Sequence, residues 1–248
     1  MRAVNRLFEA QGTTIFAVMS QLAGEHGAIN LGQGAPDDEG PEDLRRRAME
    51  AIEKGPNQYP PMMGVPELRE AVGAHDNRFY DLNVDWQREV LVTAGATEAL
   101  AAALMGLLNP GDEAILIEPA YDSYRPIIEA AGAIPVNVQL RAPDWKLDEE
   151  ALARAFSSKT KLLVFNSPMN PTGHVFSKAE LEAIAALARK HDIYVICDEV
   201  YEHLIYSGHE HIPLMSLPGM RERCVKIGSA GKTFSLTGWK IGYITAPE

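Results

Sequence analysis

Three short segments of the chain hold the side chains of a candidate reactive site. They are residues 166–173, 197–201 and 229–233, and together they supply an amide, a carboxylate, a phenol, a hydroxyl and an amine. Such a set suits a cofactor with an aldehyde, a ring nitrogen, a phenolic oxygen and a phosphate, because each of those groups needs a partner of one of these types. The residue types therefore predict a binding site for pyridoxal phosphate.

Lys232 and Asp198 take the two central roles in this prediction. The amine of Lys232 would form an imine with the cofactor aldehyde, and the carboxylate of Asp198 would keep the ring nitrogen protonated. Asn170 and Tyr201 can donate hydrogen bonds to the phenolic oxygen. Taken singly, these residues have ordinary interpretations as a surface lysine, a strand-end acid and turn residues. Their occurrence together, each after an apolar run, favours one shared site.

The segment around Gly95 predicts a place for the phosphate. Residues 90–93 have the composition of a strand, Gly95 is a turn residue, and an Ala- and Leu-rich helix would begin at Ala96. The first N–H groups of a helix are free, and its dipole attracts anions. By itself the pattern is equally consistent with an ordinary turn between a strand and a helix.

Two other segments resemble nucleotide-binding motifs only in part. Residues 228–233 end in Gly-Lys-Thr, but Lys226 stands where a P-loop requires its first glycine. Gly32 and Gly34 are not followed by the third glycine of a dinucleotide fingerprint, and Pro36 stands where the helix should open. The sequence therefore favours neither ATP nor a nicotinamide cofactor.

Composition indicates a globular enzyme. The chain has 248 residues, of which 46% are hydrophobic, and a formal net charge of −11, which argues against a nucleic-acid surface. Cys197 and Cys224 lie in apolar runs and are expected to be buried free thiols of a reducing compartment. With no secretory signal and no long apolar segment visible, we expect a cytoplasmic protein without a membrane span. His209 and His211 belong to an expected polar loop, and no metal site is predicted.

The order of apolar runs predicts an α/β fold. Strand-like runs at residues 114–117, 162–165, 194–197 and 225–227 alternate with helical ones, which is typical of a mostly parallel sheet with helices on both faces. Further helices are expected over residues 14–23 and after Pro41 and Pro66, and Ser177 and Glu180 form a capping box. Ligands of such sheets bind beyond the carboxyl ends of the strands, where Asn166, Asp198 and Ser229 are expected to converge.

As a set, these motifs resemble the class I aminotransferases, which belong to the fold type I pyridoxal phosphate enzymes. The resemblance is strongest to the branch that holds kynurenine, glutamine, methionine and succinyldiaminopimelate aminotransferases. It extends over nearly the whole chain and includes the motifs at residues 31–36, 57–59, 95–99, 118–121 and 238–242. It implies a three-layer α/β/α large domain, here residues 39–248, preceded by an arm and small-lobe segment at residues 1–38. It also implies a homodimer.

The resemblance implies a role for each candidate residue. Lys232 would carry the Schiff base and move a proton between the substrate's α-carbon and the cofactor, with Asp198 on the ring nitrogen and Tyr201 on the phenolic oxygen. Tyr121 would stack on the ring, since an aromatic face suits a flat, electron-poor ring. The phosphate would be bound by Gly95, Ala96, Thr97, Ser229 and Lys240, and by Tyr59 of the neighbouring subunit. The substrate would lie near Gln33, Gly34 and Asn170.

The expected reaction is transfer of an amino group between an amino acid and a 2-oxo acid. Two alternatives use the same residues: a carbon–sulfur β-lyase, because proton removal from the α-carbon precedes either outcome, and a noncatalytic relative that binds the cofactor. In the resembling family the chain continues into a C-terminal lobe that carries the arginine for the substrate's α-carboxylate, whereas this sequence stops at Glu248. We therefore expect a fragment whose isolated activity is in doubt and whose uncovered apolar surface favours aggregation.

Overall fold

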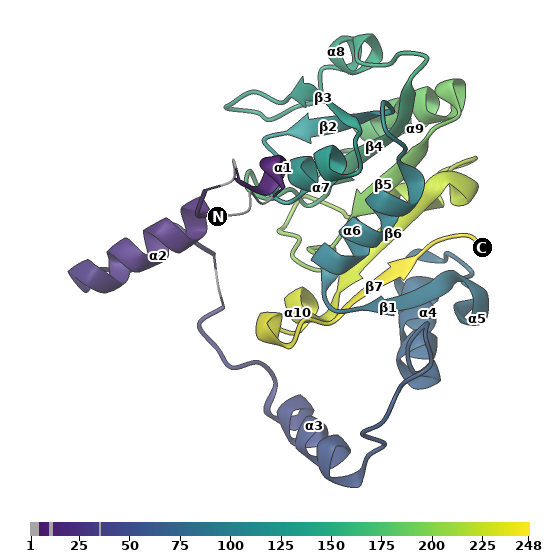
Figure 1. Cartoon of the computed structure of the whole chain (residues 1–248). Coiled ribbons are helices and arrows are strands. Elements are labelled where there is room, and N and C mark those ends of the chain that lie inside the picture. The colour runs from purple at the N-terminus through teal and green to yellow at the C-terminus, as the bar shows by residue number, and fades with distance from the viewer. Residues whose placement is uncertain (1–4, 10–11, 35) are drawn as a thin grey trace.

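A computed structural model describes residues 5–9, 12–34 and 36–248. Seven strands form one sheet that runs through the centre of the molecule, and helices lie on both sides of it (Figure 1). The strands are β1 (Val90–Thr93), β2 (Glu113–Glu118), β3 (Ile134–Gln139), β4 (Thr160–Asn166), β5 (Tyr194–Asp198), β6 (Cys224–Ser229) and β7 (Gly242–Thr245). The three-layer α/β/α prediction is confirmed.

The strand order across the sheet is β1-β7-β6-β5-β4-β2-β3. The neighbouring pairs from β6 to β3 are all parallel, whereas β7 runs antiparallel to both β6 and β1. The sheet is therefore mostly parallel, and one reversed strand lies between β1 and the rest.

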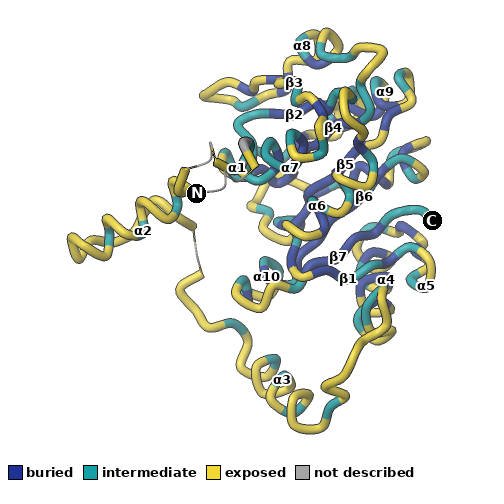
Figure 2. Tube along the Cα trace, viewed as in Figure 1, coloured by how far each residue is buried: buried dark blue, intermediate teal, exposed yellow. Residues whose placement is uncertain are grey.

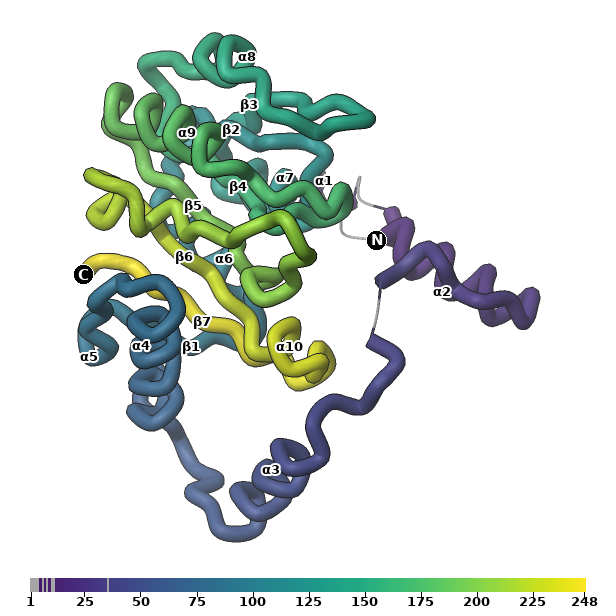
Figure 3. The backbone as a smooth tube through the Cα atoms, turned by 180° about the vertical axis from the view of Figure 1, so that it is seen from behind, coloured from purple at the N-terminus to yellow at the C-terminus, as the bar shows by residue number. Residues whose placement is uncertain are grey.

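Two apolar clusters, one on each face, hold the layers together. Helices α6 (Ala96–Leu107) and α7 (Tyr124–Ala130) cover one face and pack Leu100, Leu104 and Ile128 against it. On the other face, seen from behind in Figure 3, α4 (Pro66–Tyr80) and α9 (Lys178–His191) contribute residues such as Val72 and Ile184. The continuous apolar runs of β4 and β5 follow from this double coverage, because both faces of each strand are buried.

The remaining helices are short or lie at the periphery. They are α1 (Arg6–Glu9), α2 (Ile15–His26), α3 (Glu42–Lys54), α5 (Trp86–Glu89), α8 (Glu149–Arg154) and α10 (Ala230–Thr233), with 3₁₀ turns at Leu214–Ser216, Arg221–Arg223 and Thr237–Trp239. None of the helices among the described residues is both long and apolar enough to cross a lipid bilayer.

Local signals place the predicted helix starts correctly. Ser177 accepts a hydrogen bond from the N–H of Glu180, whose side chain accepts from the Ser177 N–H, so the capping box of α9 is confirmed. Pro66 is the first residue of α4, as expected for a residue without an N–H. Pro41 directly precedes α3, and Thr14 caps α2 with its hydroxyl.

The N-terminal helices lie apart from the sheet. Neither α2 nor α3 has a buried residue, and both are largely yellow in Figure 2. Several large apolar side chains here are exposed, among them Ile15, Met49 and Ile52. Between α2 and α3 the chain contacts the segment after α10 at Gly40, where an added Cβ would lie 2.5 Å from Cδ2 of Leu236. Such an approach requires glycine, whose φ of +72° also favours it.

Candidate active site

The strand register places the candidate residues side by side at one end of the sheet. Asn166, the last residue of β4, pairs with Asp198, the last residue of β5. Ser229 ends β6 and pairs with Gly242, which also pairs with Thr93 at the end of β1. The loops that follow these strands therefore begin at one edge, as the sequence predicts.

Asp198 is a buried carboxylate within a network of hydrogen bonds. Only 5% of the residue is exposed, and its Oδ2 accepts a hydrogen bond of 2.5 Å from the hydroxyl of Tyr124. Burial raises the pKa of Asp198 to about 6, against the lowering effects of that hydroxyl, the Val200 N–H and the charge of Lys232. A carboxyl of this kind binds a cationic N–H more strongly than a solvated carboxyl does, because little water competes for it.

Asn166 joins the two neighbouring loops. Its Nδ2 donates to the carbonyl oxygen of Asp198 at 2.7 Å, and its Oδ1 accepts from the backbone N–H of Asn170 at 2.6 Å. The Ser167 N–H also donates to the Asp198 carbonyl, at 3.2 Å. Asn166 thus fixes the position of Asn170 relative to Asp198, which explains why an amide at the end of β4 matters to the site.

Lys232 lies in the short helix α10, which directly follows β6. Its Nζ lies 5.4 Å from the ring centroid of Tyr201. Burial and the nearby charge of Lys240 lower the pKa of Lys232, while Asp198 acts in the opposite direction. A larger fraction of this amine is therefore neutral, which is the form that attacks carbonyl carbons and accepts protons.

Three phenols border the space between Asp198 and Lys232. The rings of Tyr121 and Tyr124 meet edge to face with their centroids 5.7 Å apart. Tyr201 is half-buried. Burial, with the charge of Asp198, raises the pKa of Tyr201, so the phenol stays protonated and can donate a hydrogen bond.

The start of α6 forms a candidate anion site. Gly95 precedes the helix without a side-chain cap, so the N–H groups of Ala96 and Thr97 have no partner inside the helix. A Cβ on Gly95 would lie 3.7 Å from the Cα of Lys240, and one on Gly242 would lie 2.4 Å from the carbonyl carbon of Gly95. The absence of a side chain at Gly242 thus lets the β7 backbone approach the positive end of the helix, while Gly95 is favoured by its φ of +86°.

Gln33, Gly34 and Tyr59 are not part of this cluster in the single chain. Gln33 accepts a hydrogen bond of 3.3 Å from Ser20, and both Gln33 and Gly34 are exposed. Tyr59 is 99% exposed. No hydrogen bond among the described residues connects these three with Lys232, so their predicted roles stay predictions.

Sequence reasoning missed Tyr124 and the environment of His211. Tyr124 lies three residues after Tyr121 in an aromatic-rich turn, but nothing local indicates that its hydroxyl reaches Asp198. The expected polar loop holds for His209, which is exposed, and is wrong for His211. His211 is buried, and its Nε2 lies 3.1 Å from Oε2 of Glu199 in the segment that follows β5.

Comparison with known proteins identifies the family. The sequence model of "Aminotransferase class I and II" matches residues 26–248. The chain therefore belongs to the class I and II aminotransferases, whose members depend on pyridoxal phosphate. The sequence-based resemblance and the cofactor prediction are confirmed at the level of the family.

Individual relatives agree with this result. The chain is 51% identical over 238 residues to a Mycobacterium tuberculosis protein described as "Probable N-succinyldiaminopimelate aminotransferase DapC". It is 44% identical over 236 residues to the methionine aminotransferase of Escherichia coli and 44% identical over 242 residues to human kynurenine–oxoglutarate transaminase 1. These alignments cover 92 to 95% of this chain, whereas the chain spans only 57 to 61% of the three relatives.

Solved structures show the same architecture. The N-succinyldiaminopimelate aminotransferase of Mycobacterium tuberculosis matches with a TM-score of 0.96 and 48% identity, over 99% of this chain and 64% of that chain. The aspartate aminotransferase of Thermus thermophilus with maleate matches with a TM-score of 0.92 and 36% identity, over 100% of this chain and 65% of that chain.

The residues of the site fit pyridoxal phosphate. A ring nitrogen requires a carboxylate, an aldehyde requires an amine and a phosphate requires an anion site, and Asp198, Lys232 and the start of α6 offer one of each. The fit also rests on charge, because Lys232 and Lys240 lie close enough for one to lower the pKa of the other, as suits a site for an anion.

Proposed function

We propose that the protein transfers amino groups between an amino acid and a 2-oxo acid, with pyridoxal phosphate bound through Lys232. The observation that carries the proposal is the place of Lys232 directly after β6, the strand that pairs with β5, whose last residue is the buried Asp198. Membership of the aminotransferase family supports it. Because the chain spans about 60% of the length of the curated relatives it matches, the activity is proposed for the whole protein.

We assign the cofactor contacts as follows. Asp198 would accept the N–H of the cofactor ring, Asn170 and Tyr201 would donate to its phenolic oxygen, and Tyr121 would hold the ring. The phosphate would be bound by Gly95, Ala96, Thr97, Ser229 and Lys240. Tyr59 would bind the phosphate of a second copy of the chain, and Gln33, Gly34 and Asn170 would contact the substrate.

The protein's own part in the reaction is binding and proton transfer. When bound, pyridoxal phosphate supplies an electron-withdrawing cationic ring that acidifies the α-hydrogen of an amino acid attached to it. Lys232 would serve as the general base that moves this proton, because burial and the charge of Lys240 lower the pKa of its amine. Tyr201, held near the Lys232 amine, assists with its hydroxyl. Asp198 would supply the carboxylate that pairs with the ring nitrogen.

We propose a homodimer as the working form. Exposed apolar side chains on α2 and α3 and the fully exposed Tyr59 support this, because such residues become buried at an interface with a second copy. Residues 1–38 then serve as an arm and small-lobe segment, and residues 39–248 as the cofactor-binding domain. Two buried cysteines without a disulfide support a location in the cytoplasm.

Borohydride trapping tests the assignment of Lys232. The protein is incubated with pyridoxal phosphate and reduced with borohydride, and the peptide masses are measured. We expect one cofactor on the peptide that contains Lys232, and none on that peptide in Lys232→Ala. Lys178→Ala, which alters an exposed lysine of α9, is the matched control and should label normally. Labelling of another peptide, or retention of turnover by Lys232→Ala, would exclude the proposed mechanism.

A substrate screen tests the reaction itself. N-Succinyldiaminopimelate, methionine and kynurenine, the compounds in the relatives' names, are offered as amino donors with 2-oxoglutarate. We expect a new 2-oxo acid and glutamate in equal amounts. Formation of ammonia with pyruvate from a cysteine conjugate, without amino transfer, would instead indicate a β-lyase.

A further inference from the structure

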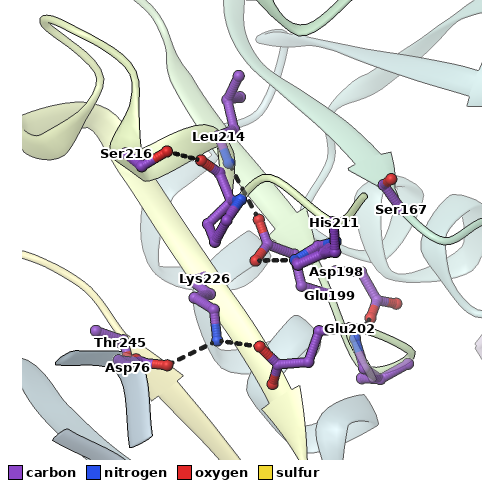
Figure 4. A network of polar contacts seen from close by, with 12 residues as sticks. Asp76, Ser167, Asp198, Glu199, Glu202, His211, Leu214, Ser216, Lys226 and Thr245 are labelled. Carbon is purple, nitrogen blue, oxygen red and sulfur yellow. Dashed lines mark hydrogen bonds and ion pairs between the residues drawn. The ribbon is translucent and has the colours of Figure 1, made fainter. Parts of the chain in front are cut away.

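A second polar cluster lies on the α4 side of the sheet. Lys226 of β6 is 1% exposed, and its Nζ lies 3.0 Å from Oδ1 of Asp76 and 3.0 Å from Oε2 of Glu202. Figure 4 shows Lys226 between these two carboxylates, with Thr245 beside Asp76. The proposed reaction uses neither Asp76 nor Lys226.

This cluster holds more acidic than basic groups. Asp76, Glu199 and Glu202 are all buried, with 0%, 0% and 2% exposure, and Lys226 is the basic residue between Asp76 and Glu202. Buried carboxylates need cationic or hydrogen-bonding partners. Oε2 of Glu202 forms the ion pair with Lys226 and has no other partner among the described residues, so one of its lone pairs is left for a further ligand.

Two histidines lie at the solvent side of the cluster. Nε2 of His75, on α4, lies 2.6 Å from Nε2 of His203, in the segment after β5. Nδ1 of His75 lies 3.1 Å from Oδ1 of Asp76. Histidines that bind metals usually donate the N–H of their second ring nitrogen to a carboxylate, which orients the ring. Asp76 can serve His75 in this way.

We propose that His75, Glu202 and His203 form a binding site for one Zn²⁺ ion that connects α4 to the segment after β5. One potential ligand atom from each of the three residues lies within 4.8 Å of the others. Two imidazoles and one carboxylate are a usual zinc ligand set, with water in the fourth position. Phe79, whose ring centroid lies 5.0 Å from those of both His75 and His203, gives the site an apolar wall.

Access favours this site over a neighbouring one. Glu199, Glu202 and His211 also lie within 4.8 Å of one another, but all three are buried, and His211 already contacts Glu199. In the proposed site His203 is exposed and His75 is partly exposed, so two of its three ligands lie at the solvent boundary and only Glu202 is buried. The sequence did not indicate the site, because His75 and His203 are 128 positions apart.

Metal titration of the purified chain tests the proposal. After removal of any polyhistidine tag, free cofactor and chelatable metal, Zn²⁺ binding is measured by calorimetry, and Co²⁺ is added as a spectroscopic probe. We expect one saturable ion per chain and visible Co²⁺ bands of a site with fewer than six ligands. Loss of a residue that only hydrogen-bonds to a metal ligand weakens metal binding by about 10- to 100-fold. Because His203 is a proposed ligand itself, His203→Ala should weaken Zn²⁺ binding by at least this factor.

The controls separate a built site from surface binding. His203 is exposed, so its substitution leaves the buried cluster intact, and unchanged circular dichroism verifies this. His209→Ala removes another exposed histidine and should leave Zn²⁺ affinity unchanged. Absence of saturable binding in the unaltered protein, or equal affinity in His203→Ala, would overturn the proposal. Trapping of the cofactor on Lys232 is independent of either result.

Discussion

Tyr124 donates a hydrogen bond of 2.5 Å to Oδ2 of Asp198, and both residues are buried. Tyr124 is the first residue of α7, whereas Asp198 ends β5, so the bond ties a helix of one layer to the carboxyl end of the sheet. It also orients the carboxylate that we assign to the cofactor ring. The tyrosine is therefore a positioning residue for the proposed site.

Removal of this hydroxyl should weaken the site at neutral pH. We expect Tyr124→Phe to lower the free energy of unfolding by about 1 to 3 kcal/mol at pH 8, since a buried carboxylate loses its donor. The effect should be smaller at pH 5, below the pKa of about 6 of Asp198, because a neutral acceptor forms a weaker bond. Urea unfolding at both pH values measures it. Tyr206→Phe, at a residue that is 83% exposed, is the control, and equal losses at both pH values would contradict the assignment.

The pKa of Asp198 predicts a pH dependence of stability. Burial raises it from 3.8 to about 6, so the folded state holds this proton more tightly than the unfolded state. The contribution to stability is present below pH 3.8 and is lost as the pH rises through 6. Relative to Asp198→Asn, the cofactor-free protein should lose about 3 kcal/mol of unfolding free energy between about pH 4 and pH 7. A constant difference between the two proteins over this range would show that Asp198 titrates normally.

The contact of Gly242 with the start of α6 predicts a steric effect on cofactor binding. A Cβ at this position would lie 2.5 Å from the Ala96 nitrogen, so Gly242→Ala must displace the helix start or β7. We expect a loss of about 1 to 3 kcal/mol in stability and weaker binding of pyridoxal phosphate. Gly106→Ala is a matched control, because Gly106 belongs to the same helix and has open space around it. Gly106→Ala should raise the free energy of unfolding by roughly 0.5 to 1 kcal/mol. Equal affinity of Gly242→Ala and Gly106→Ala for pyridoxal phosphate would refute the predicted steric effect.

The buried lysine should be essential for stability. Burial alone would raise the pKa of Asp76, but the charge of Lys226 and several hydrogen bonds outweigh burial and lower it to about 2. Its contribution is thus present above pH 3.8 and is lost as the pH falls toward 2. Lys226→Met leaves two buried carboxylates without their cation and should lower the free energy of unfolding by about 3 to 5 kcal/mol at pH 7. The difference in unfolding free energy between Lys226→Met and the unaltered protein should become smaller as the pH falls toward 2, because Asp76 then becomes protonated.

An exposed lysine provides the comparison for this experiment. Lys178→Met removes the same charge at a solvated position. We expect it to lower the free energy of unfolding by less than about 0.5 kcal/mol. A similar small effect of Lys226→Met would mean that the carboxylates are solvated or protonated, contrary to their burial.

Local patterns were sufficient to predict most of the elements. The capping box at Ser177 and the strand that ends at Asp198 depend on residues within a few positions of one another. The convergence of Asn166 and Asp198 also followed from sequence, because parallel strands present their carboxyl ends at one edge. Lys232 was singled out through its neighbours in the motif, and its role in the reaction stays a prediction.

Contacts between distant segments were not predictable in this way. The hydrogen bond from Tyr124 to Asp198 joins residues 74 positions apart, and the ion pair of Asp76 with Lys226 joins residues 150 positions apart. A tyrosine or aspartate on a helix has no local feature that indicates a buried partner. The burial of His211 escaped prediction for the same reason, since it depends on the path of the loop and not on neighbouring residues.

The place of β7 between β1 and β6 affects how the protein matures on the ribosome. Val90 pairs with Thr245, so β1 is translated long before the strand that holds it in the sheet. A growing chain must keep β1 from pairing with other polypeptides during this interval, and such nonlocal pairing slows folding. Slower translation or a bound chaperone before Gly242 emerges should therefore influence the yield of folded protein.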